Sequence, residues 1–375
     1  MFKKWVFVFC MFFTVNCWGS EKEPDVNALS AVLIDADTGR VLWGKNENEP
    51  MAMASTTKIM TAIVTLENAD INEKVTVSKN ATLAPQVKMN LQEGEELTLE
   101  QLLYALLMQS SNDAAVAIAE KVGGSVENFC AMMNKKAKEL GCKDTEFVTP
   151  NGLDKGNHHS TAYDMAIIGA YAIRNDEFIR ISNTKNVSFT SNKKNYSIVN
   201  KNQLLNSYEG AIGIKTGFTG KAGHCFVGAA KRGDVTLVSV VLASGWGTAG
   251  KANKWTDTRE ILNYGFDNYK KYSIIGDKAD ICVDKAKVNK TTLKYENSIR
   301  LLMKESERDN IAFKNNLPEM IEAPIRKGEK IGTGEVYLGD LKVGQVNLIA
   351  TENIEKHSLG NSFDKIIKEW LKFVC

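Results

Sequence analysis

Between residues 27 and 268 the chain alternates between stretches with strand-like and helix-like spacing of apolar residues. After Ser55, apolar residues recur at Ile59, Ala62, Ile63 and Leu66, which predicts a helix with one buried face that begins near Ser55. Glycine, proline and capping residues bound the other segments, so that strands are predicted at 29–35, 40–44, 74–78, 210–218, 223–230 and 235–243, and helices at 99–108, 114–122, 126–140, 161–174 and 256–264. Several helices among antiparallel strands indicate an α+β domain of roughly residues 27–268.

Two stretches depart from this pattern. Residues 182–206 are polar, and we expect an irregular segment there. From Tyr272 the chain consists of short β-like pieces separated by turns, such as Gly339-Asp340. This texture predicts a small, separate all-β domain at residues 272–350.

The N-terminus has the pattern of an exported protein. Phe2-Lys3-Lys4 is a short basic region, and the apolar run from Trp5 to Val15 is too short to span a bilayer comfortably. Small residues around Gly19 offer a cleavage point. We therefore predict a signal peptide at residues 1–19 and an extracytoplasmic location at the cytoplasmic membrane or the cell wall, with an uncleaved anchor as the alternative to the signal peptide.

Residues 355–375 predict an amphipathic C-terminal helix. Lysines lie opposite an apolar stripe made by Phe363, Ile366, Ile367, Trp370, Leu371 and Val374. Such a helix suits peripheral attachment to the outer face of the cytoplasmic membrane, with Trp370 at the level of the lipid headgroups. Packing of the same stripe onto the β domain is the alternative.

The composition argues against several classes of partner and cofactor. The formal net charge is only +2 over 375 residues, and no Lys/Arg cluster is interleaved with aromatic residues, so no nucleic-acid partner is expected. The adjacent His158 and His159 lack helical metal-ligand spacing, and we expect neither a metal nor another cofactor. The cysteines that follow the signal peptide predict buried thiols with at most one disulfide among Cys130, Cys142, Cys225, Cys282 and Cys375.

The pair Ser55-x-x-Lys58 suits nucleophilic catalysis. One helical turn places the lysine on the same side as the serine. A serine hydroxyl is a weak nucleophile at neutral pH and needs a base within reach. Lysine can be that base only if burial and nearby positive charge lower its pKa. An isolated S-x-x-K is more often a capping serine followed by a surface lysine, so the pair needs further support.

Two further motifs provide that support. Ser110-x-Asn112 is predicted at a turn between two apolar helices, and Lys215-Thr216-Gly217 in a strand that enters a glycine-rich bend. S-x-x-K, S-x-N and K-T-G in this order are typical of class A β-lactamases and penicillin-binding proteins.

With these motifs the chain resembles the low-molecular-weight penicillin-binding proteins, the serine-type D-alanyl-D-alanine carboxypeptidases of the peptidase S11 type. The resemblance covers most of the chain after the signal peptide, and it includes residues 110–114, 149–153, 161–164, 213–219, 262–266 and 323–332. It implies a penicillin-binding/β-lactamase-like domain followed by the β domain and the tail. It also implies covalent inhibition by β-lactam antibiotics.

This chemistry needs a nucleophile, a base and a proton relay. In the reaction that the resemblance implies, Ser55 attacks the carbonyl between the two terminal D-alanines of a peptidoglycan stem peptide, and water then hydrolyses the acyl-enzyme. Lys58 is the candidate base. Ser110 and Asn112 complete the hydrogen-bond relay between Lys58, the leaving amine and the substrate backbone.

The third motif and its surroundings are expected to bind the substrate. Lys215 supplies positive charge that keeps Lys58 neutral, and Thr216 can hydrogen-bond the substrate carboxylate. Gly217 leaves room for the substrate to lie as an added strand. By resemblance, the N–H groups of Ser55 and Phe218 form the oxyanion hole. Lys254 stands where relatives carry a carboxylate-binding arginine, and lysine lacks the arginine's bidentate fork.

Three other functions compete with this interpretation. A class A β-lactamase needs a deacylating glutamate in an E-x-x-L-N stretch, and none occurs between Asn112 and Lys215. A D,D-endopeptidase that cuts peptidoglycan cross-links uses the same motifs and stays open, although the β domain and the tail favour the carboxypeptidase. A wall-associated scaffold with a dead site is disfavoured because every predicted reactive residue is present.

Overall fold

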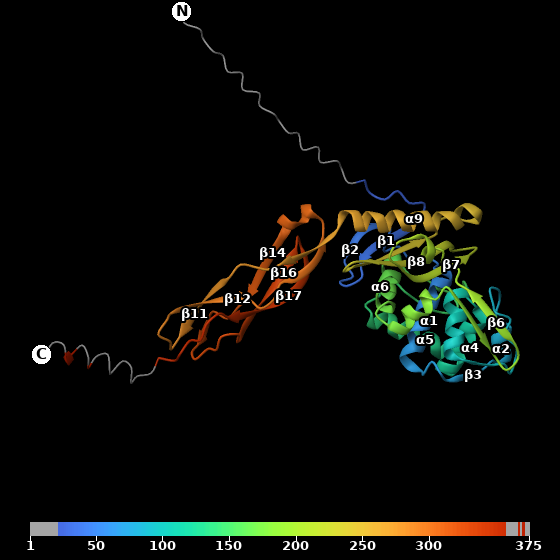
Figure 1. The fold of residues 1–375 in the computed structure, drawn as a ribbon, viewed down its shortest axis with the longest axis horizontal. Helices are drawn as coiled ribbons and strands as arrows, with labels where there is room; N and C mark the ends of the chain where they lie inside the picture. Colours follow the sequence, from blue (N-terminus) through green and yellow to red (C-terminus); the bar gives the residue numbers. More distant parts are fainter. Residues whose placement is uncertain (1–21, 358–366, 368–369, 372–375) are drawn as a thin grey trace, which may run out of the picture.

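The computed structural model describes residues 22–357 and, beyond them, residues 367, 370 and 371. The predicted signal peptide at 1–19 and most of the predicted tail at 355–375 lie outside the described residues. Among the residues that are described, no helix is both long and apolar enough to cross a membrane. The described chain forms an α+β part and an all-β part that extends away from it (Figure 1).

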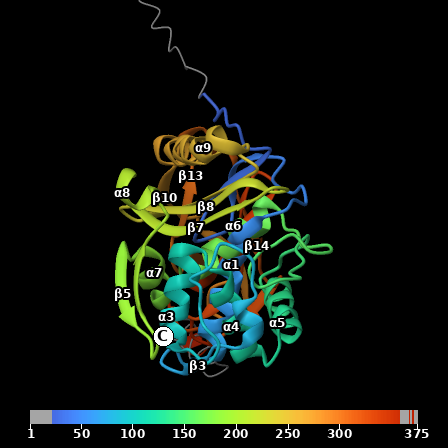
Figure 2. The ribbon, with the colours of Figure 1, turned by 90° about the vertical axis from the view of Figure 1, so that its right-hand side faces the viewer.

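A five-stranded antiparallel sheet forms the centre of the α+β part, with the strand order β2-β1-β9-β8-β7. Alternate residues of β1 face two different cores: Val32 and Ile34 pack with most of the helices, whereas Ala31 and Leu33 pack with α9. Figure 2 shows α9 on one side of the sheet and α1, α4 and α6 on the other. The strands span Ser30–Asp35 (β1), Val41–Lys45 (β2), Ala211–Thr219 (β7), Gly223–Arg232 (β8) and Val235–Leu242 (β9).

Helix α9 spans Gly247–Asn268 and is much longer than the predicted helix at 256–264. The sequence predicts an end at Gly265, but that residue lies inside the helix. A Cβ on Gly265 would lie 2.6 Å from Leu237 Cδ1 and 2.7 Å from Leu33 Cδ2. Gly265 is thus a point of close helix-to-sheet packing, and this packing outweighs the low helix propensity of glycine.

Helix α1, Lys58–Asn68, lies at the centre of the other face, against α4, α5, α6 and α7. The apolar pattern predicts one buried face, yet every residue from Lys58 to Thr65 is buried. A helix surrounded on all sides loses its polar face, so the polar residues of α1 must find partners inside the protein. Its neighbours span Asn112–Gly123 (α4), Val126–Glu139 (α5), Ala162–Ala172 (α6) and Asp176–Asn183 (α7).

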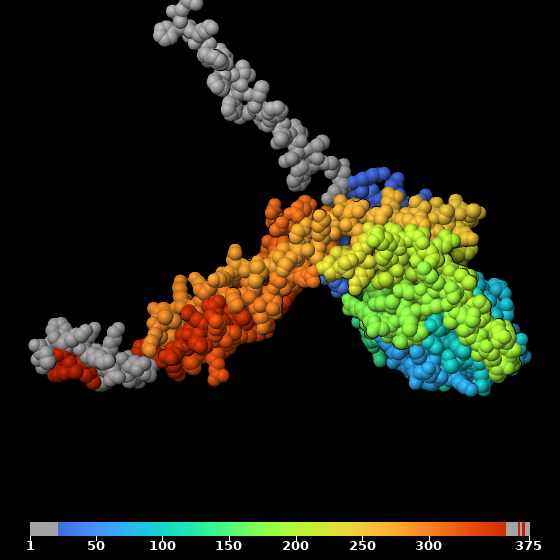
Figure 3. All heavy atoms as spheres, viewed as in Figure 1, coloured from blue at the N-terminus to red at the C-terminus, as the bar shows by residue number. Residues whose placement is uncertain are grey.

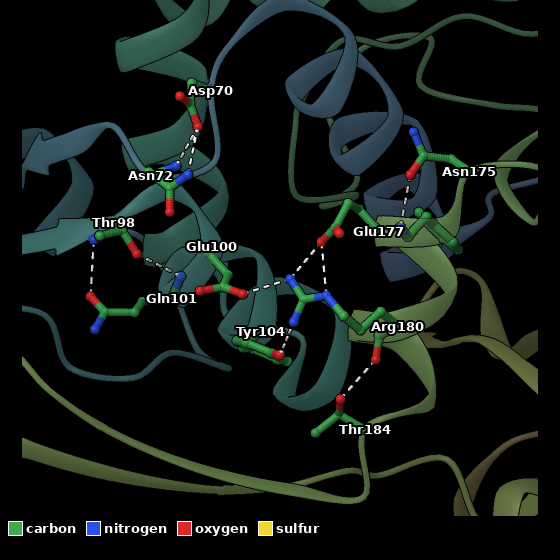
Figure 4. A network of polar contacts seen from close by, with 11 residues as sticks. Asp70, Asn72, Thr98, Glu100, Gln101, Tyr104, Asn175, Glu177, Arg180 and Thr184 are labelled. Atoms are coloured by element: carbon green, nitrogen blue, oxygen red, sulfur yellow. Dashed lines mark hydrogen bonds and ion pairs between the residues drawn. The ribbon is translucent and has the colours of Figure 1, made fainter.

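The predicted break between two apolar helices is present. Helix α3, Leu99–Tyr104, begins with a capping box between Thr98 and Gln101 and continues as a π-helical turn, η2, over Ala105–Gln109. Arg180 of α7 contacts Glu100 and the Tyr104 hydroxyl, both at 2.6 Å, and so ties α7 to α3 (Figure 4). The chain then turns at Ser110, whose φ of 71° is left-handed, and α4 starts at Asn112.

The prediction of an irregular segment at 182–206 is wrong. A hairpin forms there from β5, Asn186–Thr190, and β6, Asn195–Val199, and a short helix α8 follows at Leu204–Ser207. Most of the hairpin residues are exposed or half-buried, so the alternation of apolar residues that marks a strand is weak here. The rings of Phe189 and Tyr196 pack against each other across the two strands. The remaining short elements of this part are β3 (Lys74–Thr76), α2 (Lys79–Thr82) and β4 (Glu96–Thr98).

The all-β part has its own two apolar cores and forms a narrow arm beside the rounder α+β part (Figure 3). Its six-stranded sheet has the order β14-β16-β17-β12-β11-β15, and β10 pairs with β13. The domain limits 27–268 and 272–350 stay predictions. The elements span Lys270–Ile274 (β10), Ala279–Asp284 (β11), Lys290–Tyr295 (β12), Ile299–Met303 (β13), Glu305–Asn310 (η3), Ile311–Asn316 (β14), Met320–Glu322 (β15), Lys330–Leu338 (β16) and Leu341–Ala350 (β17).

The cysteines differ from the prediction in one respect. Cys130, Cys142, Cys225 and Cys282 are free thiols, and Cys375 lies outside the described residues. Cys130 and Cys225 are buried and Cys142 is half-buried, but Cys282 is exposed on β11. Strand β11 alternates between buried and exposed positions, and Cys282 falls on its exposed face.

Candidate active site

Ser55 lies in a single 3₁₀ turn, η1, that spans Ala54–Thr57 and runs directly into α1. Ser55 therefore lies near a helix start as predicted, although the turn is tighter than an α-helix, and its role as nucleophile stays a prediction. Ala54 has a left-handed φ of 49°, and the Thr57 hydroxyl donates to its carbonyl at 2.8 Å. His158 supports Thr57 from behind, with Nε2 at 2.8 Å from the hydroxyl oxygen.

The tautomer of His158 follows from its second contact. The Val148 N–H donates to His158 Nδ1 at 3.0 Å, so Nδ1 is unprotonated and Nε2–H donates to Thr57. Burial lowers the pKa of His158 to about 4, so the ring is neutral at physiological pH. The neutral His158 thus stabilises the turn that carries Ser55 through its hydrogen bond to Thr57.

Lys58 is completely buried and lies next to Ser55. Its Nζ is 2.9 Å from Ser55 Oγ, 2.8 Å from Asn112 Oδ1 and 2.5 Å from the carbonyl oxygen of Asn151. The two carbonyl-type oxygens can only accept, so they take two N–H groups of the amine. The third direction points to Ser55. A neutral amine has its lone pair there and accepts the Ser55 O–H.

Burial is the main cause that lowers the pKa of Lys58 well below its usual value of 10.5. The positive charge of Lys215 lowers it further, Asp113 opposes the shift, and Lys201 adds to it. Lys215 is itself buried, and burial together with Lys201 and Lys254 lowers its pKa to about 7. The site therefore favours the neutral Lys58 that a general base requires.

The orientation of Asn112 is set by its amide nitrogen. Asn112 Nδ2 donates to the carbonyls of Pro85 and Gln86 at 3.0 and 3.1 Å, which leaves Oδ1 to face Lys58. Asp113 fixes the same loop, because its carboxylate accepts the N–H groups of Met89 and Leu91. These hydrogen bonds hold residues 85–91 beside Asn112.

Ser110 is buried at the end of η2, two residues before Asn112. Its hydroxyl makes no hydrogen bond to any residue that the structure describes. The amine of Lys201 donates to the carbonyl of the preceding Gln109 at 2.9 Å, so a second lysine lies beside this turn. The relay role of Ser110 stays a prediction.

The third motif lies on β7, the edge strand of the sheet. A Cβ on Gly217 would lie 3.1 Å from the Ser55 nitrogen and 3.1 Å from Ala54 Cβ, so a larger residue would push this strand away from the nucleophile turn by a few tenths of an ångström. Lys215 is buried, and its Nζ donates to the Thr216 carbonyl at 2.9 Å. Phe218 is half-exposed, with its ring 4.4 Å from that of His224.

Burial lowers the pKa of both Lys215 and His224, and Lys254, on the buried side of α9, is close enough to lower both further. Burial lowers its own pKa to about 8. Its Nζ lies 4.9 Å from the Trp255 ring and has no hydrogen-bond acceptor among the described residues. A carboxylate bound beside β7 would supply one.

The site belongs to a known family. A family model for D-alanyl-D-alanine carboxypeptidases of the peptidase S11 type matches residues 19–245, which include all three motifs. The chain belongs to the S11 family. A second model, for the C-terminal domain of penicillin-binding protein 5, matches residues 269–356. The predicted family and fold class are confirmed, apart from the C-terminal helix, which lies outside the described residues.

Several named S11 enzymes match over nearly the whole chain. The D-alanyl-D-alanine carboxypeptidase DacF of Bacillus subtilis is 34% identical and covers 92% of this chain and 90% of its own length. DacC of Escherichia coli is 33% identical over 89% of this chain and 86% of its own. The solved structure of penicillin-binding protein 5 from Haemophilus influenzae is 29% identical, with a TM-score of 0.71, and covers 89% of this chain and 99% of that one. These matches confirm the predicted enzyme class.

Sequence motifs do not predict two features of this S11 site. The Asn151 acceptor is a backbone carbonyl, which no side-chain pattern reveals. Lys201 lies in the polar stretch that we expected to be irregular, where one lysine among many carries no signal. The family resemblance at residues 149–153 marks this loop but assigns no role to its carbonyl.

Gly152 permits the close contact between the Asn151 loop and the nucleophile turn, and we expect its replacement to be severe. It has a left-handed φ of 82°, and a Cβ would lie only 2.0 Å from the Ala54 carbonyl oxygen. Gly152→Ala should lose about 3 kcal/mol of unfolding free energy and roughly 100-fold in the rate of penicillin acylation, because the backbone must move away from η1.

Gly156→Ala is the matched control in the same loop. Gly156 also has a positive φ, 53°, but the nearest atom to its Cβ would be 4.0 Å away. It should lose only about 1 kcal/mol and retain acylation. Chemical denaturation and stopped-flow acylation measure both effects. Equal losses for the two variants would contradict the assigned contact.

Proposed function

We propose that the chain is a serine-type carboxypeptidase that removes the terminal D-alanine from peptidoglycan stem pentapeptides through an acyl-enzyme on Ser55. The observation that supports it best is the buried Lys58 amine, 2.9 Å from Ser55 Oγ and surrounded by two oxygen acceptors. The names of the S11 relatives support the same reaction.

Acylation begins when Lys58 takes the proton of Ser55. The Ser55 oxygen attacks the carbonyl between the two D-alanines, and a tetrahedral oxyanion forms. The Lys58 proton then passes, directly or through the Ser110 hydroxyl, to the nitrogen of the leaving D-alanine, and the C–N bond breaks. In the second half Lys58 takes a proton from water, which attacks the ester, and the proton returns to Ser55.

The oxyanion is expected between the N–H groups of Ser55 and Phe218. The close approach of Gly217 to the Ser55 nitrogen supports this arrangement, because it brings β7 and the nucleophile turn to the same point. Two backbone donors at such a point contribute a few kcal/mol, about 3, to lowering the barrier.

The terminal carboxylate of the substrate is expected beside Lys215, Thr216 and Lys254. Buried lysines without a nearby anion have lowered pKa values, and a carboxylate reverses part of that shift. Lys254 can replace an arginine here because several cations share the carboxylate. Lys254 then acts as a point charge and needs no bidentate geometry.

The direct test separates the carboxypeptidase from its competitors. The purified chain should release free D-alanine from a stem pentapeptide and should leave a cross-linked stem dimer intact. A pentapeptide amide should react at least tenfold more slowly, because Lys215 and Lys254 lose their anionic partner. Cleavage of the dimer at a rate similar to that of the pentapeptide would favour the endopeptidase. Fast turnover of penicillin without D-alanine release would favour a β-lactamase.

We further propose export and peripheral attachment to the membrane through residues 355–375. Ile367, Trp370 and Leu371, the described residues of this stretch's apolar stripe, are exposed. Deletion of 355–375 should leave D-alanine release from soluble peptides unchanged and should move the protein from the membrane pellet to the supernatant. Unchanged partitioning on sedimentation with lipid vesicles would contradict the anchor.

A further inference from the structure

The direction of the substrate along β7 follows from the positions of the cations. Gly217 lies beside the Ser55 nitrogen, so the scissile carbonyl lies at that level of the strand. The buried Lys215 lies two residues earlier in β7, and the terminal carboxylate must point towards it. The part of the peptide before the scissile bond therefore runs in the other direction, past Phe218 and Thr219 towards Gly220.

A half-exposed indole lies at the end of that path. Trp246, in the loop between β9 and α9, is 48% exposed, and its Nε1–H donates to the Gly220 carbonyl at 2.9 Å. The indole also packs against Gly223, where a Cβ would lie only 3.1 Å from it. The ring is thus fixed to the β7–β8 turn while one side remains open.

Spacing relates the indole to one residue of the substrate. An added strand advances by about 3.3 Å per residue, so the residue just before the cleaved D-alanine pair lies one or two positions beyond Gly217, beside Phe218 and Thr219. A long side chain at this residue can extend from there towards Gly220. In a stem pentapeptide this third residue is a diamino acid with a long aliphatic chain. The face of the indole suits such a chain, because the aliphatic chain buries apolar area against it. The ring itself loses little side-chain entropy on binding, since its hydrogen bond to Gly220 already holds it in place.

The surroundings of Trp246 suit an anionic peptide. Lys221 and Lys251 are exposed on either side of it in the sequence, in the β7–β8 turn and in α9. The His224 ring stacks on the exposed Phe218, and its Nε2–H donates to the Gly247 carbonyl at 3.1 Å. The buried Nδ1 of His224 has no partner within the described part of the chain. Exposed lysines thus lie next to the Gly220 that accepts the indole N–H and in the first turns of the helix that follows Trp246.

We propose that Trp246 determines specificity on the acyl side of the substrate by binding the aliphatic side chain of the diamino acid at the third position of the stem peptide. The proposal rests on the proposed carboxypeptidase function. Lys221 and Lys251 favour the stem over neutral peptides, because the neighbouring γ-linked glutamate carries a free carboxylate.

The test compares two substrates that differ only on the acyl side. One is the stem pentapeptide, and the other is N-acetyl-D-alanyl-D-alanine, which ends before the third residue. Trp246→Ala should lower kcat/KM about tenfold for the pentapeptide and less than twofold for the short substrate. Trp246→Phe keeps an apolar ring but loses the hydrogen bond to Gly220, and it should stay within threefold of the wild type on both. Leu341→Ala, an equally exposed apolar residue on β17, is the control and should change neither.

Each other outcome overturns the proposal. An equal loss on both substrates would mean that Trp246 only stabilises the β7–β8 turn. No loss on either would mean that the peptide does not reach the indole. If the wild-type chain released no D-alanine from either substrate, the proposed function itself would fail, and the specificity proposal with it.

Discussion

A fluorescent penicillin should label the wild-type chain at Ser55, and Ser55→Ala should carry no covalent label. Ser55 Oγ is the hydroxyl that contacts the Lys58 amine in this site, and Gly217 brings β7 to the same point. Removal of a nucleophile that forms a covalent intermediate abolishes acylation entirely and does not merely slow it. Gel fluorescence after denaturation, followed by mass spectrometry of the labelled peptide, measures the effect.

Ser273→Ala is the matched control for this experiment. Ser273 is an exposed serine on β10 in the all-β part, bonded to the Ser298 hydroxyl at 2.7 Å. It should label like the wild type. Label that persists on the Ser55 variant would place the nucleophile elsewhere and would refute the site.

The second large effect is expected at Lys58. Lys58→Met keeps the length and the apolar stem of the side chain but removes the amine, and the acylation rate should fall by about 1,000-fold because no other base contacts Ser55 among the described residues. Lys58→Arg should be equally slow. Its guanidinium is always protonated and cannot accept the Ser55 proton.

Stability provides a readout of the same lysine that does not depend on activity. A buried lysine whose pKa is lowered on folding binds fewer protons in the folded state than in the unfolded state, so it destabilises the fold increasingly as the pH falls from 10.5 towards the folded pKa. Relative to the wild type, Lys58→Met should therefore gain stability as the pH falls. Lys327→Met, at an exposed position of the all-β part, should show no such trend. If the difference in unfolding free energy between Lys58→Met and the wild type does not change with pH, Lys58 is charged in the folded protein.

The sequence predicts much of this site because its chemistry depends on side chains at fixed local spacings. Ser55 and Lys58 are one turn apart, and the capping box at Thr98 marks the helix whose end carries the second motif. The confirmed S11 family and fold class rest on such local patterns. The contact between Lys58 and Asn112 joins segments far apart in the chain, and the family resemblance predicts it where periodicity cannot.

The remaining features depend on tertiary packing. The Asn151 carbonyl reaches Lys58 because Gly152 fits against Ala54, and Gly265 stays helical because α9 packs on Leu33 and Leu237. The β5–β6 hairpin has too few buried positions for a clear strand pattern. In each case the decisive neighbour lies far away in the sequence, so a window along the chain does not contain it.

The central claim is that a neutral Lys58 takes the proton of Ser55. The most direct measurement is the second-order rate of Ser55 acylation by penicillin between pH 5 and pH 11. Our account predicts that this rate rises tenfold per pH unit at low pH and stops rising well below 10.5, at the lowered pKa of Lys58. At higher pH the rate should fall, because Lys215 and Lys254, whose pKa values are lowered to about 7 and about 8, lose the charge that binds the penicillin carboxylate. A rate that continues to rise to pH 10.5 or above would show that Lys58 is charged in the free enzyme and would contradict the account.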